Sequence, residues 1–346
     1  MRYIGSKGLL LDNINQVIEE NVDGANSFMD IFSGTASVAR YFKKSYEVMS
    51  NDIIYFSYVL QKATIENDKE PSFKTLKKSG IEDPFKYLEE EPLDKFQFNN
   101  KKSFIQNNYS PNEFSDRMYF TNENARRIDF IRVKIEEWFS KKYILENEYF
   151  YLLAGLIEAV PFISNISGTY GAYLKHWDKR ALKPLRMVKP EVMTNSKLNK
   201  SFNADGNELV REIKGDILYI DPPYNNRQYL PNYHVLETIA KYDHPEIYGI
   251  TGLRPYKEVK SKYCNKSSVA ETFSDLIENA NFEHIVLSYS TEGIMDSESI
   301  INILEKWCIK ESIKEYRFPY RRYKGKLSAK KHDLHELIFY AQKKVY

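Results

Sequence analysis

This 346-residue sequence has few of the residues that mark secreted, metal-stabilised or membrane proteins. Its two cysteines, Cys264 and Cys308, form no CxxC pair, so neither a disulfide framework nor a thiolate zinc site is supported. Its six histidines show no ligand pattern, and no apolar run reaches the roughly 18 residues that suggest a membrane helix. The first residues also lack the apolar core of a secretory signal. We therefore expect a cytoplasmic protein that does not cross a membrane and holds no metal.

The sequence also has no large excess of charge of one sign. It contains 50 Lys and Arg residues and 48 Asp and Glu residues, for a net charge of +2. This balance permits a nucleic-acid partner without requiring one. The 27 tyrosines supply planar rings suited to base stacking, although a coding bias toward Tyr, Lys, Asn and Ile explains them equally well. With 42% hydrophobic residues, the chain is long enough for one large domain and an insertion.

A short apolar run, residues 217–220, leads directly into Asp221, two prolines and Tyr224. Its β-branched and aromatic residues predict a buried strand, and the prolines end it because they cannot donate to a sheet ladder. Asp221 is therefore predicted at the exit of a central strand. In open α/β sheets, that edge is where ligands bind.

An earlier segment has the order of a nucleotide-binding unit. Residues 27–32 predict a strand, Ser33 to Ser37 a tight turn around Gly34, and the next residues a helix. A second predicted strand, residues 46–50, ends in Asn51 and Asp52. Asp52 thus lies roughly 20 residues beyond the turn, the spacing of an acid that accepts from ribose hydroxyls.

The middle of the chain, from about residue 65 to 192, changes to helical spacing with many Lys, Glu, Asn and aromatic residues, which predicts an inserted helical domain. Within it, the loop at residues 164–175 suits either close approach of a flexible nucleic-acid strand or an internal network of turns. Near the end, residues 312–318 and 334–340 predict two strands, and the basic segment 321–326 between them predicts a hairpin tip that meets a phosphate backbone.

Four motifs, taken in order, resemble those of the Dam-like (alpha-group) DNA adenine-N6 methyltransferases. They are Arg2-Tyr3-Ile4-Gly5-Ser6-Lys7, Phe28-Met29-Asp30-Ile31-Phe32-Ser33-Gly34-Thr35, Asn51-Asp52 and Asp221-Pro222-Pro223-Tyr224. Residues 3–7, 164–175 and 233–238 are similar to the branch found in restriction-modification systems. The chain departs from the family at Ala36, where a second glycine is usual.

The resemblance implies a fold and a division into domains. We expect an α/β protein, with the Rossmann-like mixed sheet of a class I methyltransferase and an inserted, mainly helical target-recognition domain. Residues 1–65 and 200–346 would form the discontinuous catalytic domain. Residues 66–199 would form the inserted domain that recognises DNA.

The resemblance also implies S-adenosylmethionine as the cofactor and a set of residues that bind it. Its methionine part would be surrounded by Tyr3, Gly5, Ser6, Lys7, Asp30, Phe32, Ser33, Gly34 and Thr35. Asp30 would lie near the ammonium and Asp52 would hold the ribose hydroxyls. Asp205 would accept from the adenine amine, and Ile53 would pack on that ring.

The implied activity is site-specific methylation of adenine N6 in double-stranded DNA, with Asp221, Pro222, Pro223 and Tyr224 as the catalytic residues. An adenine amine is a poor nucleophile, and two acceptors, the Asp221 carboxylate and the Pro222 carbonyl, would favour its tetrahedral form. Tyr224 would stack on the flipped base. We expect further nucleic-acid contacts from Lys175, Asn225, Arg227, Arg321, Arg322 and Lys324.

Several alternatives stay open at this point. The same chemistry would serve an RNA adenine or cytosine-N4 methyltransferase, although the large insertion favours duplex DNA. A DNA-binding subunit without catalysis is the alternative from another class, and the intact Asp221, Asp52 and Gly34 argue against it. A cognate restriction endonuclease is a candidate partner, and both a monomer and a dimer are compatible with the sequence.

Overall fold

The structure, a computed structural model, describes residues 7–99, 102–319 and 335–344. The chain divides into two compact units, each built from separate segments. The first, which we call the sheet unit, comprises Gly5–Ile53, Asn195–Gln228 and Lys260–Tyr346. The second, the helical unit, comprises Ile54–Thr194 and Tyr229–Val259 among the described residues.

The sheet unit contains a seven-stranded sheet in the order β3-β2-β1-β4-β5-β7-β6. The neighbours from β3 to β5 run parallel, whereas β7 runs antiparallel to both β5 and β6. The strand order reverses at β1 and β4, which lie side by side. The strands are β1 (Ser27–Asp30), β2 (Glu47–Asn51), β3 (Lys200–Phe202), β4 (Lys214–Ile220), β5 (Asn281–Ser290), β6 (Lys314–Pro319) and β7 (His335–Gln342).

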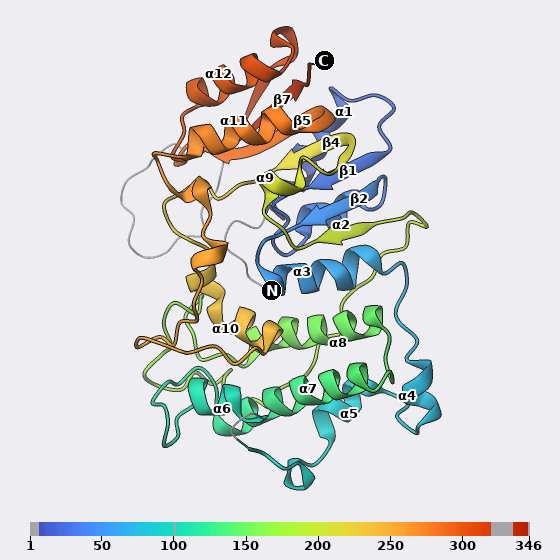
Figure 1. Cartoon of the computed structure of the whole chain (residues 1–346), viewed down its shortest axis with the longest axis vertical. Coiled ribbons are helices and arrows are strands. Elements are labelled where there is room, and N and C mark those ends of the chain that lie inside the picture. Colours follow the sequence, from blue (N-terminus) through green and yellow to red (C-terminus); the bar gives the residue numbers. More distant parts are fainter. Residues whose placement is uncertain (1–6, 100–101, 320–334, 345–346) are drawn as a thin grey trace. The chain divides into compact units, whose positions relative to one another are not determined.

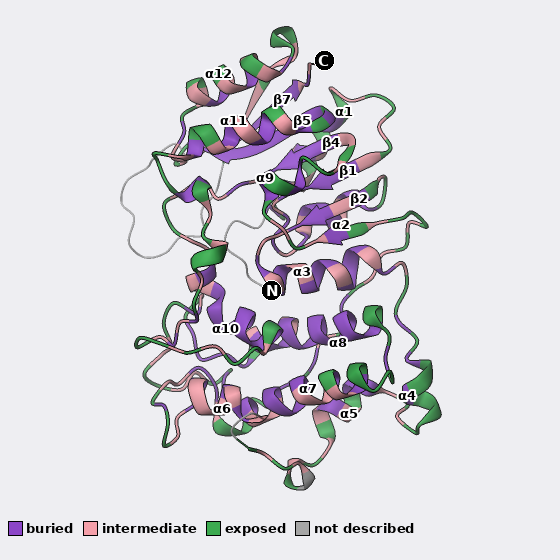
Figure 2. Ribbon diagram, in the orientation of Figure 1, coloured by how far each residue is buried: buried purple, intermediate pink, exposed green. Residues whose placement is uncertain are grey.

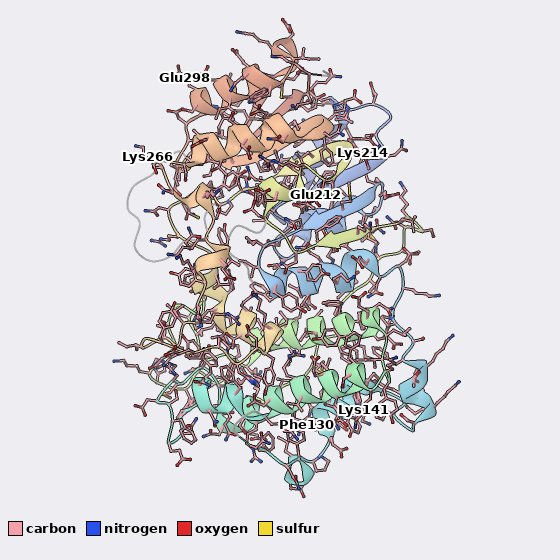
Figure 3. The ribbon with its side chains drawn as sticks, viewed as in Figure 1. Phe130, Lys141, Glu212, Lys214, Lys266 and Glu298 are labelled. Atoms are coloured by element: carbon pink, nitrogen blue, oxygen red, sulfur yellow. The ribbon has the colours of Figure 1, made fainter. Side chains whose placement is uncertain are left out.

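The central strand β4 is buried along its second half because it has a parallel neighbour on each side. Figure 2 shows β4 and β5 largely as buried residues. Figure 3 labels Glu212 and Lys214, two exposed charged residues that lead into β4 at the end of the strand remote from Asp221. The strand therefore runs from a charged, solvated start to a buried end, where Asp221 follows.

Two helices of the sheet unit, α11 and α12, contact each other and turn apolar residues toward a shared core (Figure 1). These residues include Phe273, Leu276, Ile300 and Leu304. They pack with buried residues of β4, β5 and β7 in the same cluster. The helices of this unit are α1 (Leu11–Glu19), α2 (Ser37–Phe42), α9 (Gly206–Leu209), α11 (Val269–Asn279) and α12 (Ser297–Trp307), with short turns η6 (Lys262–Cys264) and η7 (Lys310–Ser312).

The helical unit is held together partly by buried acids at helix N-termini, where backbone N–H groups lack partners within the helix. Asp129 accepts from the amides that open α6, and Glu237 on α10 accepts from those that open α3. The helices are α3 (Tyr55–Gln61), α4 (Lys74–Lys78), α5 (Pro84–Glu90), α6 (Phe104–Tyr109), α7 (Asn122–Ser140), α8 (Glu146–Ala159) and α10 (Leu230–Lys241), with the π-helical η1 (Lys62–Glu66) and the turns η2 (Leu93–Lys95), η4 (Val160–Phe162) and η5 (Lys257–Val259).

The mixed α/β sheet expected from the sequence is confirmed. The compact units have other boundaries than the predicted domains, however, because the helical unit begins at Ile54 and also contains residues 229–259. Contacts explain that assignment, since Glu237 caps α3 and the His234 ring bonds to the Tyr170 carbonyl. That this unit recognises DNA stays a prediction. Across the described residues, no helix is both long and apolar enough to span a bilayer.

Candidate active site

Asp30 ends β1 in the middle of the sheet, beside the point where the strand order reverses. Its side chain is 1% exposed, and its Oδ2 accepts a 2.8 Å hydrogen bond from the Ser33 hydroxyl. Its Oδ1 is buried and has no hydrogen-bond partner. Burial raises the pKa of Asp30 to about 8, against the lowering effect of the Ser33 bond, and the negative charge of Asp221 adds to the rise. Such a carboxyl is suited to a cationic ligand group.

The turn after β1 is built on two residues with left-handed backbone. Gly34 has φ 50° and Ala36 has φ 61°, a conformation that costs an L-residue with a Cβ roughly 1 kcal/mol. This explains physically why a glycine is usual at the position of Ala36. The amide of Gly34 donates to Asp52 Oδ2 at 2.9 Å, so the turn and the acid after β2 are joined directly.

Asn51, the last residue of β2, ties three segments of the sheet edge together. Its Nδ2 donates to the carbonyls of Ile31 and Ala204 at 3.0 and 3.1 Å, and its Oδ1 accepts from the Ala204 amide at 3.0 Å. The side chain is 1% exposed. Asn51 thus fixes the exits of β1, β2 and β3 relative to one another, which positions Asp52 within hydrogen-bonding distance of Gly34.

A second group of charges surrounds the exit of β4. The Lys7 ammonium lies 3.3 Å from Asp221 Oδ1 and donates a 3.0 Å hydrogen bond to Glu336 Oε2. The same ammonium is at ion-pair distance from Asp221. The Asp221 Oδ1 atom is buried, and no other donor among the described residues hydrogen-bonds to it. Burial raises the pKa of Asp221 to about 6, although the positive charge of Lys7 opposes that rise. For Lys7, the charges of Asp221 and Glu336 outweigh burial, so its pKa is raised.

The residues that follow Asp221 are fixed by backbone and ring contacts. Pro222 is buried, and neither proline has an N–H group to donate. The carbonyl of Tyr224 accepts from the Ile294 amide at 2.9 Å, and the Lys7 ammonium lies 5.2 Å from the Tyr224 ring centroid. The ring also meets Tyr289 edge-on at 5.9 Å. An aromatic face, a cation and a carboxylate are therefore gathered beside the exit of β4.

The predicted contacts to the cofactor's adenine lie on other segments of the sheet unit. Asp205 is exposed and caps α9 through Oδ1, which accepts from the amides of Asn207 and Glu208. Phe32 packs edge-on against Tyr263, with ring centroids 5.2 Å apart. Ile53 is half-buried directly after Asp52, and Thr35 is half-buried in the turn. Cofactor binding by these residues stays a prediction.

The predicted nucleic-acid contacts fall in different parts of the chain. Lys175 is exposed in the helical unit, whereas Asn225 and the exposed Arg227 belong to the sheet unit. Asn225 Oδ1 accepts from the Arg227 amide at 2.9 Å, which shapes this loop locally. Tyr3, Gly5, Ser6, Arg321, Arg322 and Lys324 lie outside the described residues.

The loop at residues 164–175 contains the internal network that the sequence left open as one alternative. Ser164 Oγ lies 2.9 Å from the Tyr170 hydroxyl, and Asn165 bonds to Leu174 through both backbone and side chain. The Tyr170 carbonyl accepts from Tyr119 at 2.7 Å. The same loop exposes Lys175, so an ordered network and contact with a ligand are compatible.

Sequence reasoning missed one member of the charged group, Glu336 on β7. The signal was a single acid inside a predicted apolar strand, directly before Leu337, Ile338 and Phe339. A carboxylate at such a position is buried only when a partner compensates its charge. Over the described ranges, no group of three His, Cys, Asp or Glu residues is arranged to hold a metal ion.

Comparison with known proteins gives one family and several relatives. Residues 3–303 match the D12 class N6 adenine-specific DNA methyltransferases. Type II methyltransferase M.FokI of Planomicrobium okeanokoites is 57% identical over 346 residues, and modification methylase StsI of Streptococcus sanguinis 46%. These alignments cover 100% and 99% of this chain but 53% and 52% of the relatives, so the chain spans about half of their length. Type II methyltransferase M.NlaIII of Neisseria lactamica is 39% identical, with 94% of this chain and 93% of the relative covered.

Proposed function

The chain belongs to the D12 class N6 adenine-specific DNA methyltransferase family, and from this premise we propose that it methylates N6 of an adenine flipped out of double-stranded DNA. One observation carries the proposal for this chain. Among the described residues, Asp221 Oδ1 is buried at the exit of β4 and is paired through charge, with the Lys7 ammonium 3.3 Å away, rather than held by a backbone or hydroxyl donor. An acceptor left open in this way suits the amine hydrogens of the target base.

The acceptor side of the proposed reaction depends on two oxygens. Asp221 would accept one N6 hydrogen through its carboxylate and Pro222 the other through its backbone carbonyl. Both bonds favour a tetrahedral nitrogen and hence a more available lone pair. Tyr224 would stack on the flipped base and offset part of the few kcal/mol that unstacking costs. Holding both reactants in line supplies much of the acceleration.

The donor side fits S-adenosylmethionine, which supplies a methyl group on a sulfonium. Asp30 would bind the ammonium of its methionine part, because Oδ1 is buried and unpaired and a nearby cation would favour the ionised carboxylate. The backbone of Gly34 allows close approach, since glycine has no Cβ. Asp52, already joined to this turn, would hold the ribose hydroxyls, and Asp205 would accept from the adenine amine.

The names of the relatives support the biological setting that we propose. M.FokI and M.NlaIII are type II methyltransferases, and StsI is a modification methylase. We infer that this chain modifies a specific DNA site in a restriction-modification system. The helical unit would supply target recognition, and a cognate restriction endonuclease would recognise the same site.

The test is transfer of a tritiated methyl group from S-adenosylmethionine to duplex DNA of diverse sequence, followed by sequencing of the modified positions. We expect label on adenine N6 within one short sequence. The matched variant Asp221→Ala should transfer no label yet still bind S-adenosylhomocysteine in calorimetry. Label on RNA or on cytosine, or undiminished turnover by Asp221→Ala, would contradict the proposal. If no DNA of any sequence acquires label, the proposal is refuted and the chain is better explained as a DNA-binding subunit without catalysis.

A further inference from the structure

Glu336 lies in an unusual place for an acid. It belongs to β7, pairs with Ser290 of β5 on one side and Phe318 of β6 on the other, and is 5% exposed. The following residues of the strand, Leu337 to Ala341, are all buried and apolar. An ionised carboxylate in such surroundings is unfavourable unless a cation compensates it. The sheet itself needs no charge at this position, because main-chain hydrogen bonds and apolar packing hold β7.

The compensating cation is Lys7, and the geometry of its contacts is unequal. Its ammonium donates a 3.0 Å hydrogen bond to Glu336 Oε2, whereas it lies farther from Asp221 Oδ1, at 3.3 Å, as an ion pair. The exposed fractions of the Lys7 and Glu336 side chains are 3% and 6%. If Glu336 were neutral, Asp221 would be the remaining carboxylate for this ammonium, and Lys7 would donate to it. That bond would occupy the acceptor that the target amine is proposed to use.

We propose that Glu336 is a positioning residue for methyl transfer, which draws the Lys7 ammonium toward itself and away from Asp221 and leaves the group of three charges with a net negative charge. The inference rests on the proposed function. When the N6 lone pair forms the bond to the methyl carbon, the electron pair of the carbon–sulfur bond returns to sulfur. The positive charge therefore passes to N6, which then releases one proton to water by way of the Asp221 carboxylate.

The net charge of the group acts on this step. With Lys7 positive and both carboxylates ionised, one negative charge remains uncompensated next to the nitrogen that becomes positive. Glu336→Gln removes that charge and frees Lys7 to pair with Asp221. We expect kcat to fall on the order of 100-fold, the lower end of the range for loss of one preorganised electrostatic contact. KM for DNA and for S-adenosylmethionine should change little, because Glu336 contacts neither.

The pH profile gives a readout that a merely structural role would not move. The charged and titratable groups that interact with Asp221 are Lys7, Glu336 from β7, Asp30 from β1 and Tyr219 from β4. Its pKa of about 6 sets the acid limb expected for the wild type, with activity lost below that pH. The negative charge of Glu336 contributes to this raised pKa. Glu336→Gln should therefore shift the acid limb to lower pH while it lowers kcat at the plateau.

The experiment compares wild type, Glu336→Gln and Glu283→Gln on the DNA site identified by sequencing. Glu283 lies on β5 of the same sheet but is exposed, so Glu283→Gln is the matched control and should retain wild-type kcat and pH profile. Calorimetry with S-adenosylhomocysteine checks that the donor side is intact in every variant. Unchanged kcat and an unmoved acid limb in Glu336→Gln would overturn the inference. That result leaves the proposed function standing, whereas a wild type without methyl transfer refutes the proposed function itself.

A second variant covers the case in which Glu336→Gln does not fold. Glu336→Asp keeps the negative charge, but its side chain is one methylene shorter, so the carboxylate lies farther from the Lys7 ammonium. A positioning role predicts lowered kcat with unchanged KM. A purely structural role predicts lowered stability in urea with unchanged kcat, and that outcome would refute the inference.

Discussion

Replacement of Asp30 by asparagine should stabilise the ligand-free protein and abolish its binding of S-adenosylmethionine. Asp30 is 1% exposed, and one of its oxygens is buried without a partner. The ionised carboxylate is therefore unfavourable until a cation arrives. Asparagine has nearly the same shape and keeps an acceptor for the Ser33 hydroxyl, but it carries no charge.

The magnitude follows from the shift in pKa from the ordinary value of 3.8 to about 8. Each unit corresponds to about 1.4 kcal/mol, so full ionisation destabilises the folded state by roughly 4–6 kcal/mol. Asparagine leaves an unpaired polar atom of its own, which costs about 1–3 kcal/mol. We therefore expect Asp30→Asn to raise the free energy of unfolding by roughly 2–4 kcal/mol at pH 8.

The sign of the pH dependence is fixed by the direction of the shift. Between the unfolded and folded pKa values, the folded state retains a proton that the unfolded state has released. Stability therefore falls as pH rises through that interval, by about 1.4 kcal/mol per unit from this group alone. The destabilisation of the folded state by ionised Asp30 is smallest below the pKa of the unfolded state and levels off above pH 8. In Asp30→Asn this contribution disappears, so the difference between the proteins should grow with pH.

Urea unfolding of both proteins between pH 5.5 and 9, without ligand, measures this difference. Parallel stability curves over that range would refute the reasoning. Calorimetry in two buffers of different ionisation enthalpy adds an independent check. Wild type should release a proton on binding S-adenosylmethionine at pH 7, because the ligand ammonium favours the ionised carboxylate, whereas Asp30→Asn should show no binding.

Four further substitutions test other parts of the protein. Asn51→Ala should lower the free energy of unfolding by about 2–4 kcal/mol because it breaks one buried and two partly buried hydrogen bonds. In urea, substitution of the exposed Asn203 by alanine should cost under about 1 kcal/mol, and equal losses would contradict the role of Asn51. Ala36→Gly should change stability by less than about 1 kcal/mol, since relief of left-handed strain offsets the freer unfolded chain, and a loss of about 2 kcal/mol would refute this balance. Lys175→Ala and Arg227→Ala should each reduce the salt dependence of DNA binding by about one phosphate contact in filter-binding titrations, and an unchanged slope would remove that residue from the interface.

Local pattern predicted much of the sheet unit. The strands at β1, β2, β4, β6 and β7 are predicted from short strand-forming segments bounded by polar or turn residues, and their positions are confirmed within a few residues. The glycine turn after β1 and the prolines after β4 act over short range, so sequence alone indicated where Asp30 and Asp221 leave the sheet. Binding roles for these residues, and the DNA contacts of Lys175 and Arg227, remain predictions.

Other features depend on residues far apart in the chain, and no local pattern encodes them. Helix α10 follows residues 221–224 in sequence, yet Glu237 and His234 attach it to the helical unit through bonds that span 181 and 64 positions. The predicted domain boundaries lacked this information.

The sequence by itself determined the class of protein, the order of its strands along the chain and the acids at their ends, because periodicity, proline and glycine act on neighbouring residues. The tertiary structure decided how those acids are charged. Lys7 and Glu336 are 329 positions apart, and only folding of β7 beside β5 places them around Asp221. Burial of the Lys7 and Glu336 side chains and of the Asp221 Oδ1 atom then sets how the Lys7 charge is shared between the two carboxylates, since that depends on distance in space and on exclusion of water.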